Sequence, residues 1–276
     1  MPAARPNVFN ITASAPFLPA LIAALRAGKL VPGFPASHDP LELARATLYL
    51  PTRRACRLAR DEFLRRIEGD AAILPRIVAL GDLGEDEIAF ADAATGALAD
   101  EALTLPEAIS GLERQLTLSQ IIAKWATVVR SAQGSPLVAN TPGAAFALAG
   151  DLARLMDDIT TRQVNWQNLD KLVPDDLDEY WQKSLEFLKF VHPNWNEFLR
   201  ERGAIEAAER RDKLIEAEAR RLASSAAPVI TAGSTGSMPA TAKLLATIAR
   251  LPHGAVVLPG LDKDLDDASW LSLIHI

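Results

Sequence analysis

The chain is poor in cysteine and histidine, and this scarcity limits the chemistry it can support. Its single cysteine, Cys56, excludes an intrachain disulfide, and one thiolate alone cannot hold a zinc ion or an iron–sulfur cluster, which need several ligands. The four histidines are scattered and show no metal-binding spacing such as HExxH. We therefore expect no resident metal centre in this chain, and a reducing compartment fits its cysteine content.

Long apolar runs and an excess of positive charge are also missing. No run reaches the roughly eighteen apolar residues that a membrane span requires, and no basic segment precedes the short apolar stretch at 16–25. We therefore expect a soluble, cytoplasmic protein without membrane contact. The formal net charge of −6 at pH 7 argues against a wholly basic nucleic-acid binder. Local patches decide such binding more than totals do, so local charge has to be considered separately.

The hydrophobic pattern of the amino-terminal part is typical of an α/β fold. With 276 residues, 49% of them hydrophobic, the chain is long enough to bury a substantial core in one large domain or two ordinary ones. Apolar segments at 7–11 and 46–51 predict strands, and each is followed by a predicted helix, at 17–25 and 52–67. Residues 75–83 predict another short strand. Repeated strand–helix units of this kind favour a parallel sheet.

A helical block interrupts this pattern. Residues 105–225 are helical almost throughout, after which 226–233 predict a strand, 238–251 a helix and 253–261 a strand. The flanking strands can enter the same sheet, which predicts one discontinuous α/β domain with a large all-helical insertion. The expected parts are 1–104, 105–225 and 226–270.

The last residues, 271–276, end the chain abruptly. Their sequence, LSLIHI, resembles the translation of a common sequencing adaptor. We expect an artificial tail here, an α/β domain that is incomplete, and a longer natural reading frame.

The segment after the second predicted strand is locally basic. Its arginines are Arg53, Arg54, Arg57, Arg60, Arg65 and Arg66. Helical spacing places an apolar stripe on one face of this helix, formed by Cys56, Ala59, Phe63 and Ile67. Arg53, Arg57 and Arg60 share another face, and Thr52 precedes the helix as a possible N-cap. A solvated arginine face and a face that meets phosphate both remain open at this point.

Acidic residues give no comparable signal for a site. The aspartates at 262, 264, 266 and 267 have the oxygen ligands that magnesium prefers, but no phosphate-binding sequence accompanies them. We expect a solvated loop there and a surface run at 85–87. Asp157 and Asp158 are expected to be exposed or to cap a helix.

The tryptophans of the helical block are expected to pack between helices, although stacking on unpaired bases is the functional alternative; they are Trp125, Trp166, Trp181 and Trp195. In the same block, helical spacing predicts an exposed, ion-paired helix from Glu206, Arg210, Glu218 and Arg221.

The order of predicted elements resembles the first half of a UvrD-like helicase, a P-loop NTPase-like domain with a parallel sheet. In active members the first loop is a Walker A sequence, whose amides and lysine bind phosphate. Here the corresponding residues, 12–16, contain no glycine and no lysine, and the nearest lysine, Lys29, lies beyond the following helix. Residues 232–236 have no carboxylate where the family has its magnesium-binding segment. Residues 256–264 keep Gly260 but lack the glutamine of the family's third motif.

Three longer strings make the resemblance more specific. YLPTRRACRLARDEFL at 49–64, LPRIVALGDLGEDEIAF at 74–90 and VITAGSTGSMPATAKLL at 229–245 resemble AddB of the alphaproteobacterial type. The resemblance implies a helicase-like region without ATPase activity, paired with an AddA-like helicase–nuclease subunit in a complex that processes DNA double-strand breaks. It implies no cofactor in this segment. An iron–sulfur cluster and magnesium are implied for a nuclease region outside the chain.

The resemblance also implies a DNA contact at the basic helix. In UvrD-like proteins the counterpart of residues 51–56 meets the backbone of the single strand, where a helix N-terminus and a hydroxyl suit an anionic oxygen. The expected nucleic-acid-binding residues are Thr52, Arg53, Arg54 and Arg57. Two alternatives remain open. The region could bind ATP through noncanonical loops using Lys29 or Lys243, or it could be a structural scaffold that binds protein only.

Overall fold

The computed structural model describes residues 5–37, 40–66, 73–80, 104–128, 141–171 and 179–260. The chain forms two compact units: Met1–Asp100 together with Ile215–Ile276, and Glu101–Leu214. Several sequence-based expectations lie outside the described residues. These concern Ile67, the acidic run at 85–87, the aspartates from 262 to 267 and the tail at 271–276.

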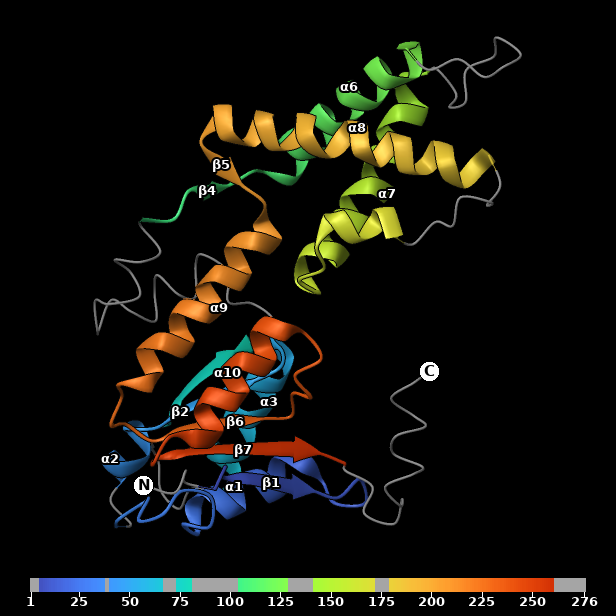
Figure 1. Cartoon of the computed structure of the whole chain (residues 1–276). Coiled ribbons are helices and arrows are strands. Elements are labelled where there is room, and N and C mark those ends of the chain that lie inside the picture. Colours follow the sequence, from blue (N-terminus) through green and yellow to red (C-terminus); the bar gives the residue numbers. More distant parts are fainter. Residues whose placement is uncertain are drawn as a thin grey trace. The chain divides into compact units, whose positions relative to one another are not determined.

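A five-stranded, fully parallel sheet organises the first unit (Figure 1). Its strands, in sheet order, are β1 (Val8–Ile11), β7 (Gly254–Pro259), β6 (Val229–Ala232), β2 (Thr47–Leu50) and β3 (Arg76–Ala79). Strands from both sides of the helical block therefore share one sheet, as the hydrophobic pattern predicts.

Side-chain alternation along the strands distributes the core between the two faces of the sheet. On β2, Leu48 and Leu50 belong to one core cluster, while the intervening Tyr49 is buried on the opposite face. The first face is covered by α1 (Phe17–Arg26) and α3 (Arg53–Arg65), which contribute Leu21, Ile22, Leu25, Cys56, Ala59 and Phe63 to this cluster. The apolar stripe predicted for residues 52–67 is confirmed at Cys56, Ala59 and Phe63.

The other face of the sheet is covered by α10 (Pro239–Arg250), which packs against β6 and β7. A short helix, α2 (Pro40–Ala44), leads into β2. Because α1, α3 and α10 each follow a parallel strand, all three helices begin at the carboxyl edge of the sheet. The loops that follow the strands therefore gather at this edge, where ligands of open α/β sheets usually bind.

Gly233, the first residue after β6, brings three of these segments together. It has a φ of +79°, a region that side chains other than glycine rarely adopt. A Cβ atom at this position would lie 3.3 Å from the Phe17 ring and 3.4 Å from the Pro51 ring. The chain after β6 therefore packs directly against the start of α1 and the residue that follows β2.

The second unit is mainly helical. Its main helices are α6 (Gly111–Val128), α7 (Pro142–Thr161) and α8 (Glu179–Arg202), with a 3-10 helix, η2 (Trp166–Lys171). Leu118, Ile122, Leu152, Val191 and Trp195 lie in its core. A pair of two-residue parallel strands, β4 (Glu107–Ala108) and β5 (Ala204–Ile205), departs from the all-helical expectation. Two residues are too few to show a strand period in the sequence.

The tryptophans largely follow the packing expectation. Trp195 is fully buried, and Trp125 is 5% exposed and meets Phe187 edge to face. Trp166 is half-buried and stacks on His192. The side chain of Trp181 lies outside the described part.

The expectation of an exposed, ion-paired helix is wrong for several residues before and within α9 (Ala207–Ala223). Glu206, Arg210 and Glu218 are buried, with exposed fractions of 7%, 8% and 3%. Glu218 accepts a hydrogen bond from the Tyr49 hydroxyl and pairs with Arg221, as helical spacing predicts. Arg210 donates to the carbonyl oxygens of residues 105 and 106. Tyr49 and residues 105 and 106 are remote in sequence from α9, so spacing within the helix does not reveal these partners.

Helices long and apolar enough to cross a membrane are absent from the described part of the chain.

Phe63 and its neighbour Leu64 give a matched test of the α3 packing. The Phe63 side chain is fully buried in the sheet–helix core, whereas Leu64 is 57% exposed. We expect Phe63→Ala to lower the free energy of unfolding by about 3–5 kcal/mol, because it leaves a cavity in a close-packed core. Leu64→Ala should change it by less than about 0.5 kcal/mol. Urea unfolding followed by circular dichroism measures both, and equal effects would contradict the packing described.

Candidate nucleic-acid interface

The expected site begins at Thr52, which follows β2 and caps α3. Its backbone is extended, with φ −141° and ψ 158°, and its Oγ1 accepts a hydrogen bond of 3.1 Å from the Ala55 N–H. The N-cap role predicted from the sequence is therefore confirmed. The first amide groups of a helix have no acceptor inside the helix, and the helix dipole adds partial positive charge at this end. The α3 N-terminus is consequently an electrostatically favourable place for an anionic oxygen.

The arginines of α3 divide into two groups. Arg60 donates to the carbonyl oxygen of Ile77 at 3.2 Å, and both Arg65 and Arg66 pair with Glu62. The hydrogen bond from Arg66 is the main reason why the pKa of Glu62 lies below its usual value. These three guanidinium groups thus serve contacts within the unit.

The arginines nearest the N-terminus of α3 form the second group. Arg53, Arg54 and Arg57 are all exposed. Arg54 and Arg57 have no hydrogen-bond or ion-pair partner within the described residues, while Arg53 has a further interaction of its own. The structure therefore places the four expected site residues together, with Thr52 as the N-cap of α3 and the three arginines in its first two turns. Within the described part of the chain, the guanidinium groups of Arg54 and Arg57 are therefore available to a ligand.

The other described segments at this edge carry hydroxyl groups and no carboxylate. Residues 12–16 include Thr12 and Ser14, whose hydroxyl oxygens lie 3.2 Å apart, and residues 233–238 include Ser234, Thr235 and Ser237. The helices α1 and α10 also begin here, with Pro16 and Met238 as N-caps that make no side-chain hydrogen bond. Three helix N-termini and the α3 arginines thus give this edge a positive character.

Neither Lys29 nor Lys243, the lysines considered for an ATP-binding alternative, is positioned to contact residues 12–16. Lys29 follows the carboxyl end of α1, a helix of 10 residues, which spans about 15 Å at about 1.5 Å per residue. Lys243 on α10 pairs with Glu216 at 3.2 Å. With no glycine in residues 12–16, the loop also lacks the sequence typical of a phosphate cradle.

The described residues contain no group of three or more histidine, cysteine, aspartate or glutamate side chains arranged to hold a metal ion. Cys56 is buried in α3. These statements cover only the residues that the structure describes.

Comparison with known proteins leaves the family open. No protein-family model matches the chain, and no curated protein matches it significantly. The resemblance to AddB therefore rests on the three sequence strings given above, and the function that it implies is a proposal.

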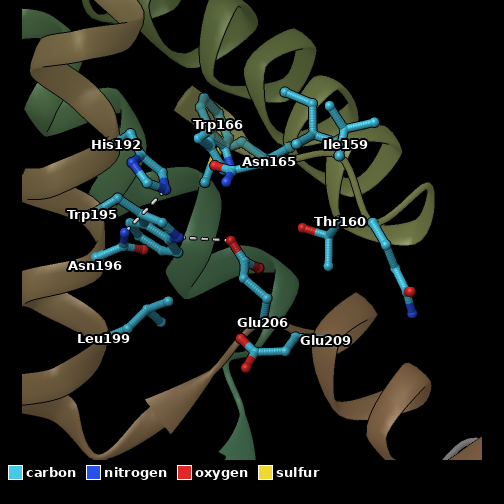
Figure 2. Close-up of a pocket in the computed structure, with 13 residues that line it drawn as sticks. Ile159, Thr160, Asn165, Trp166, His192, Trp195, Asn196, Leu199, Glu206 and Glu209 are labelled. Atoms are coloured by element: carbon cyan, nitrogen blue, oxygen red, sulfur yellow. Dashed lines mark hydrogen bonds between the residues drawn. The ribbon is translucent and has the colours of Figure 1, made fainter. Parts of the chain in front are cut away.

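Sequence reasoning missed a cavity of about 380 Å³ in the helical unit (Figure 2). It lies between α7, η2 and α8 and is lined in part by Trp166, His192, Trp195 and Glu206. The tryptophans of the helical block were a signal for it. Their spacing alone could not show which of them meet around a cavity.

The cap at Thr52 can be tested independently of any ligand. We expect Thr52→Ala to lower the free energy of unfolding by about 1 kcal/mol, because the Ala55 N–H loses its acceptor. Thr52→Ser keeps the hydroxyl and should stay close to the parent protein. Urea unfolding of the three proteins gives the comparison. A Thr52→Ala protein as stable as the parent would show that the cap contributes nothing.

Proposed function

We propose that this chain is a noncatalytic, DNA-binding, helicase-like region of an AddB-type subunit, which acts with an AddA-like partner in processing double-strand breaks. The observation that carries the proposal is the N-terminus of α3. There a capped helix end, an exposed Arg54 and an exposed Arg57 lie at the carboxyl edge of a parallel sheet. In the proposal, these groups contact phosphates of single-stranded DNA without reading its sequence.

The surrounding loops support binding rather than catalysis. Residues 12–16 and 233–238 occupy the positions where a UvrD-like ATPase would hold phosphate and magnesium. They offer hydroxyl and backbone groups but no lysine and no carboxylate. ATP turnover in the proposed complex therefore belongs to the partner subunit. An iron–sulfur cluster and magnesium belong, in the same proposal, to a nuclease region outside the chain.

The salt dependence of DNA binding tests the arginine contacts. Each phosphate contact on a single strand contributes about 0.7 to the slope of log affinity against log salt. Arg54→Gln with Arg57→Gln should therefore reduce the magnitude of that slope by about 1.4. Adding Arg53→Gln should bring the reduction to about two. Fluorescence anisotropy with a labelled thymidine oligonucleotide, between about 50 and 200 mM salt, measures the slope.

A matched control uses arginines at the opposite edge of the sheet. Arg45 lies before β2, and Arg250 lies in the last turn of α10. Replacing both by glutamine removes the same charge, yet it should leave the slope unchanged. Equal reductions in the two double variants would attribute binding to net charge alone. An unchanged slope in a folded Arg54, Arg57 variant would leave these arginines as a solvated face.

Nucleotide binding separates the proposal from an ATP-binding domain. We expect no saturable, magnesium-dependent binding of ATP to the folded chain, since residues 12–16 contain no lysine, Lys29 lies beyond α1 and Lys243 pairs with Glu216. Equilibrium titration by calorimetry measures this directly. Saturable binding that is lost on Lys243→Ala or Lys29→Ala would favour the noncanonical ATP site instead.

A further inference from the structure

The cavity of the helical unit has a wall of two stacked rings. Trp166 in η2 and His192 in α8 lie with their ring centroids 4.2 Å apart and their planes 19° from parallel. Asn196, one turn along α8, lies 3.0 Å from the His192 ring nitrogen Nε2. Burial lowers the pKa of His192, which favours the uncharged form of its ring. A ligand ring could therefore stack only on the face of Trp166 that His192 does not cover.

The floor of the cavity contains a carboxylate that is already engaged. Glu206 is 7% exposed, accepts a hydrogen bond of 2.6 Å from the Trp195 indole and lies 3.0 Å from Arg114. Figure 2 shows the Trp195 to Glu206 bond beneath the space that Trp166 and Asn165 border from the other side. Arg114 also pairs with Asp157 at 3.0 Å. Burial raises the pKa of Glu206 even with Arg114 beside it.

The second carboxylate of the cavity is neutralised as well. Glu209 pairs with Lys213 at 2.7 Å. Both acidic groups of the lining thus face a cation from the chain itself. A positively charged ligand would gain little from them, because it would have to displace an existing partner.

Uncharged hydrogen-bonding groups complete the lining. They belong to Thr160, Gln163, Asn165 and Asn196. Amide groups offer donors and acceptors in one plane, which suits the edge of a planar ring that also carries both. An aromatic wall with amides at its border combines stacking with edge recognition.

Gln163 adds an independent observation. It follows α7 with a φ of +53°, the one positive value among the described residues other than glycine. Its N–H bonds to the Thr160 carbonyl and the next N–H to the Ile159 carbonyl, the pattern of a Schellman helix end, where glycine is the usual residue. A glutamine pays conformational strain at this position. Such strain is often found where a side chain has a role in binding.

We propose that this cavity binds one planar, uncharged heteroaromatic ring of the nucleobase type, stacked beside Trp166 and hydrogen-bonded at its edge by the Gln163 amide. The ring could belong to a free nucleoside or to an unpaired base of a strand, since both present the same chemistry. The volume of about 380 Å³ lies in the range of small-molecule pockets. This inference depends on the helical unit alone and not on the role proposed for α3.

The primary test is ligand-observed NMR and calorimetry on the full chain with adenosine, guanosine and thymidine. Methylguanidinium serves as the cationic probe and cyclohexanol as an apolar probe without a planar ring. We expect saturable binding of at least one nucleoside and no binding of methylguanidinium or cyclohexanol. A short oligonucleotide that displaces the nucleoside identifies an unpaired base as the source, and failure to displace identifies a free ligand. Both results agree with the ring chemistry proposed.

Three variants locate the binding. Trp166→Leu removes the stacking ring and should weaken nucleoside affinity at least about fivefold. Phe146→Leu, the same kind of change at a 37% exposed ring of α7 outside the cavity, should leave it unchanged. Gln163→Gly removes the edge amide and should weaken affinity about two- to tenfold. Because glycine suits a positive φ, the unfolding midpoint of the Gln163→Gly protein should equal or exceed that of the parent.

Several results would overturn the proposal. One is the absence of nucleoside binding by the parent chain, and another is binding of methylguanidinium in preference to nucleosides. The same holds if Trp166→Leu, shown to be folded by circular dichroism, binds as tightly as the parent, or if Phe146→Leu weakens binding equally. Parent-like affinity in the Gln163→Gly protein, which does not depend on repacking a core, would also contradict it.

Discussion

Backbone hydrogen bonds between β2 and β6 join the two parts of the chain that the helical block separates. Thr47 pairs with Val229 and Tyr49 with Thr231 in parallel register. This pairing places the carboxyl ends of both strands at the same edge and sets Pro51 against Gly233. The position of α3, and with it of Thr52 and the exposed arginines, therefore depends on a contact between segments remote in sequence.

A buried polar contact reinforces the same strand. The Tyr49 hydroxyl donates to Glu218, which also holds Arg221, and burial is the main cause that raises the pKa of Tyr49. An apolar contact would tolerate a shift of α9 along the sheet more easily than this directional one does. Leu48 and Leu50 thus pack one face of β2 into the apolar core, while Tyr49 on the opposite face orients α9 through its hydrogen bond to Glu218.

The hydrophobic periods predicted the elements well because each period is local. Strand β2 and helices α1 and α3 lie close to their expected ranges, and Thr52 caps α3 as its position indicates. Burial of Glu206 and Glu218 could not be predicted, since their partners Trp195 and Tyr49 are joined to them only by the fold. The different roles of Arg57 and Arg60 could not be predicted for the same reason. Both look alike in the helix, yet only Arg60 reaches a carbonyl of β3.

Gly233 carries no functional group, but three segments of the chain meet at its α-carbon. A methyl group there would press on the rings of Phe17 and Pro51, so one or both would have to shift. A scan that ranks positions by charge or hydrogen-bonding capacity would pass over this residue. A substitution there would nevertheless press on Pro51, the neighbour of the Thr52 cap, so a loss of ligand affinity in such a variant would not identify the atoms that touch the ligand.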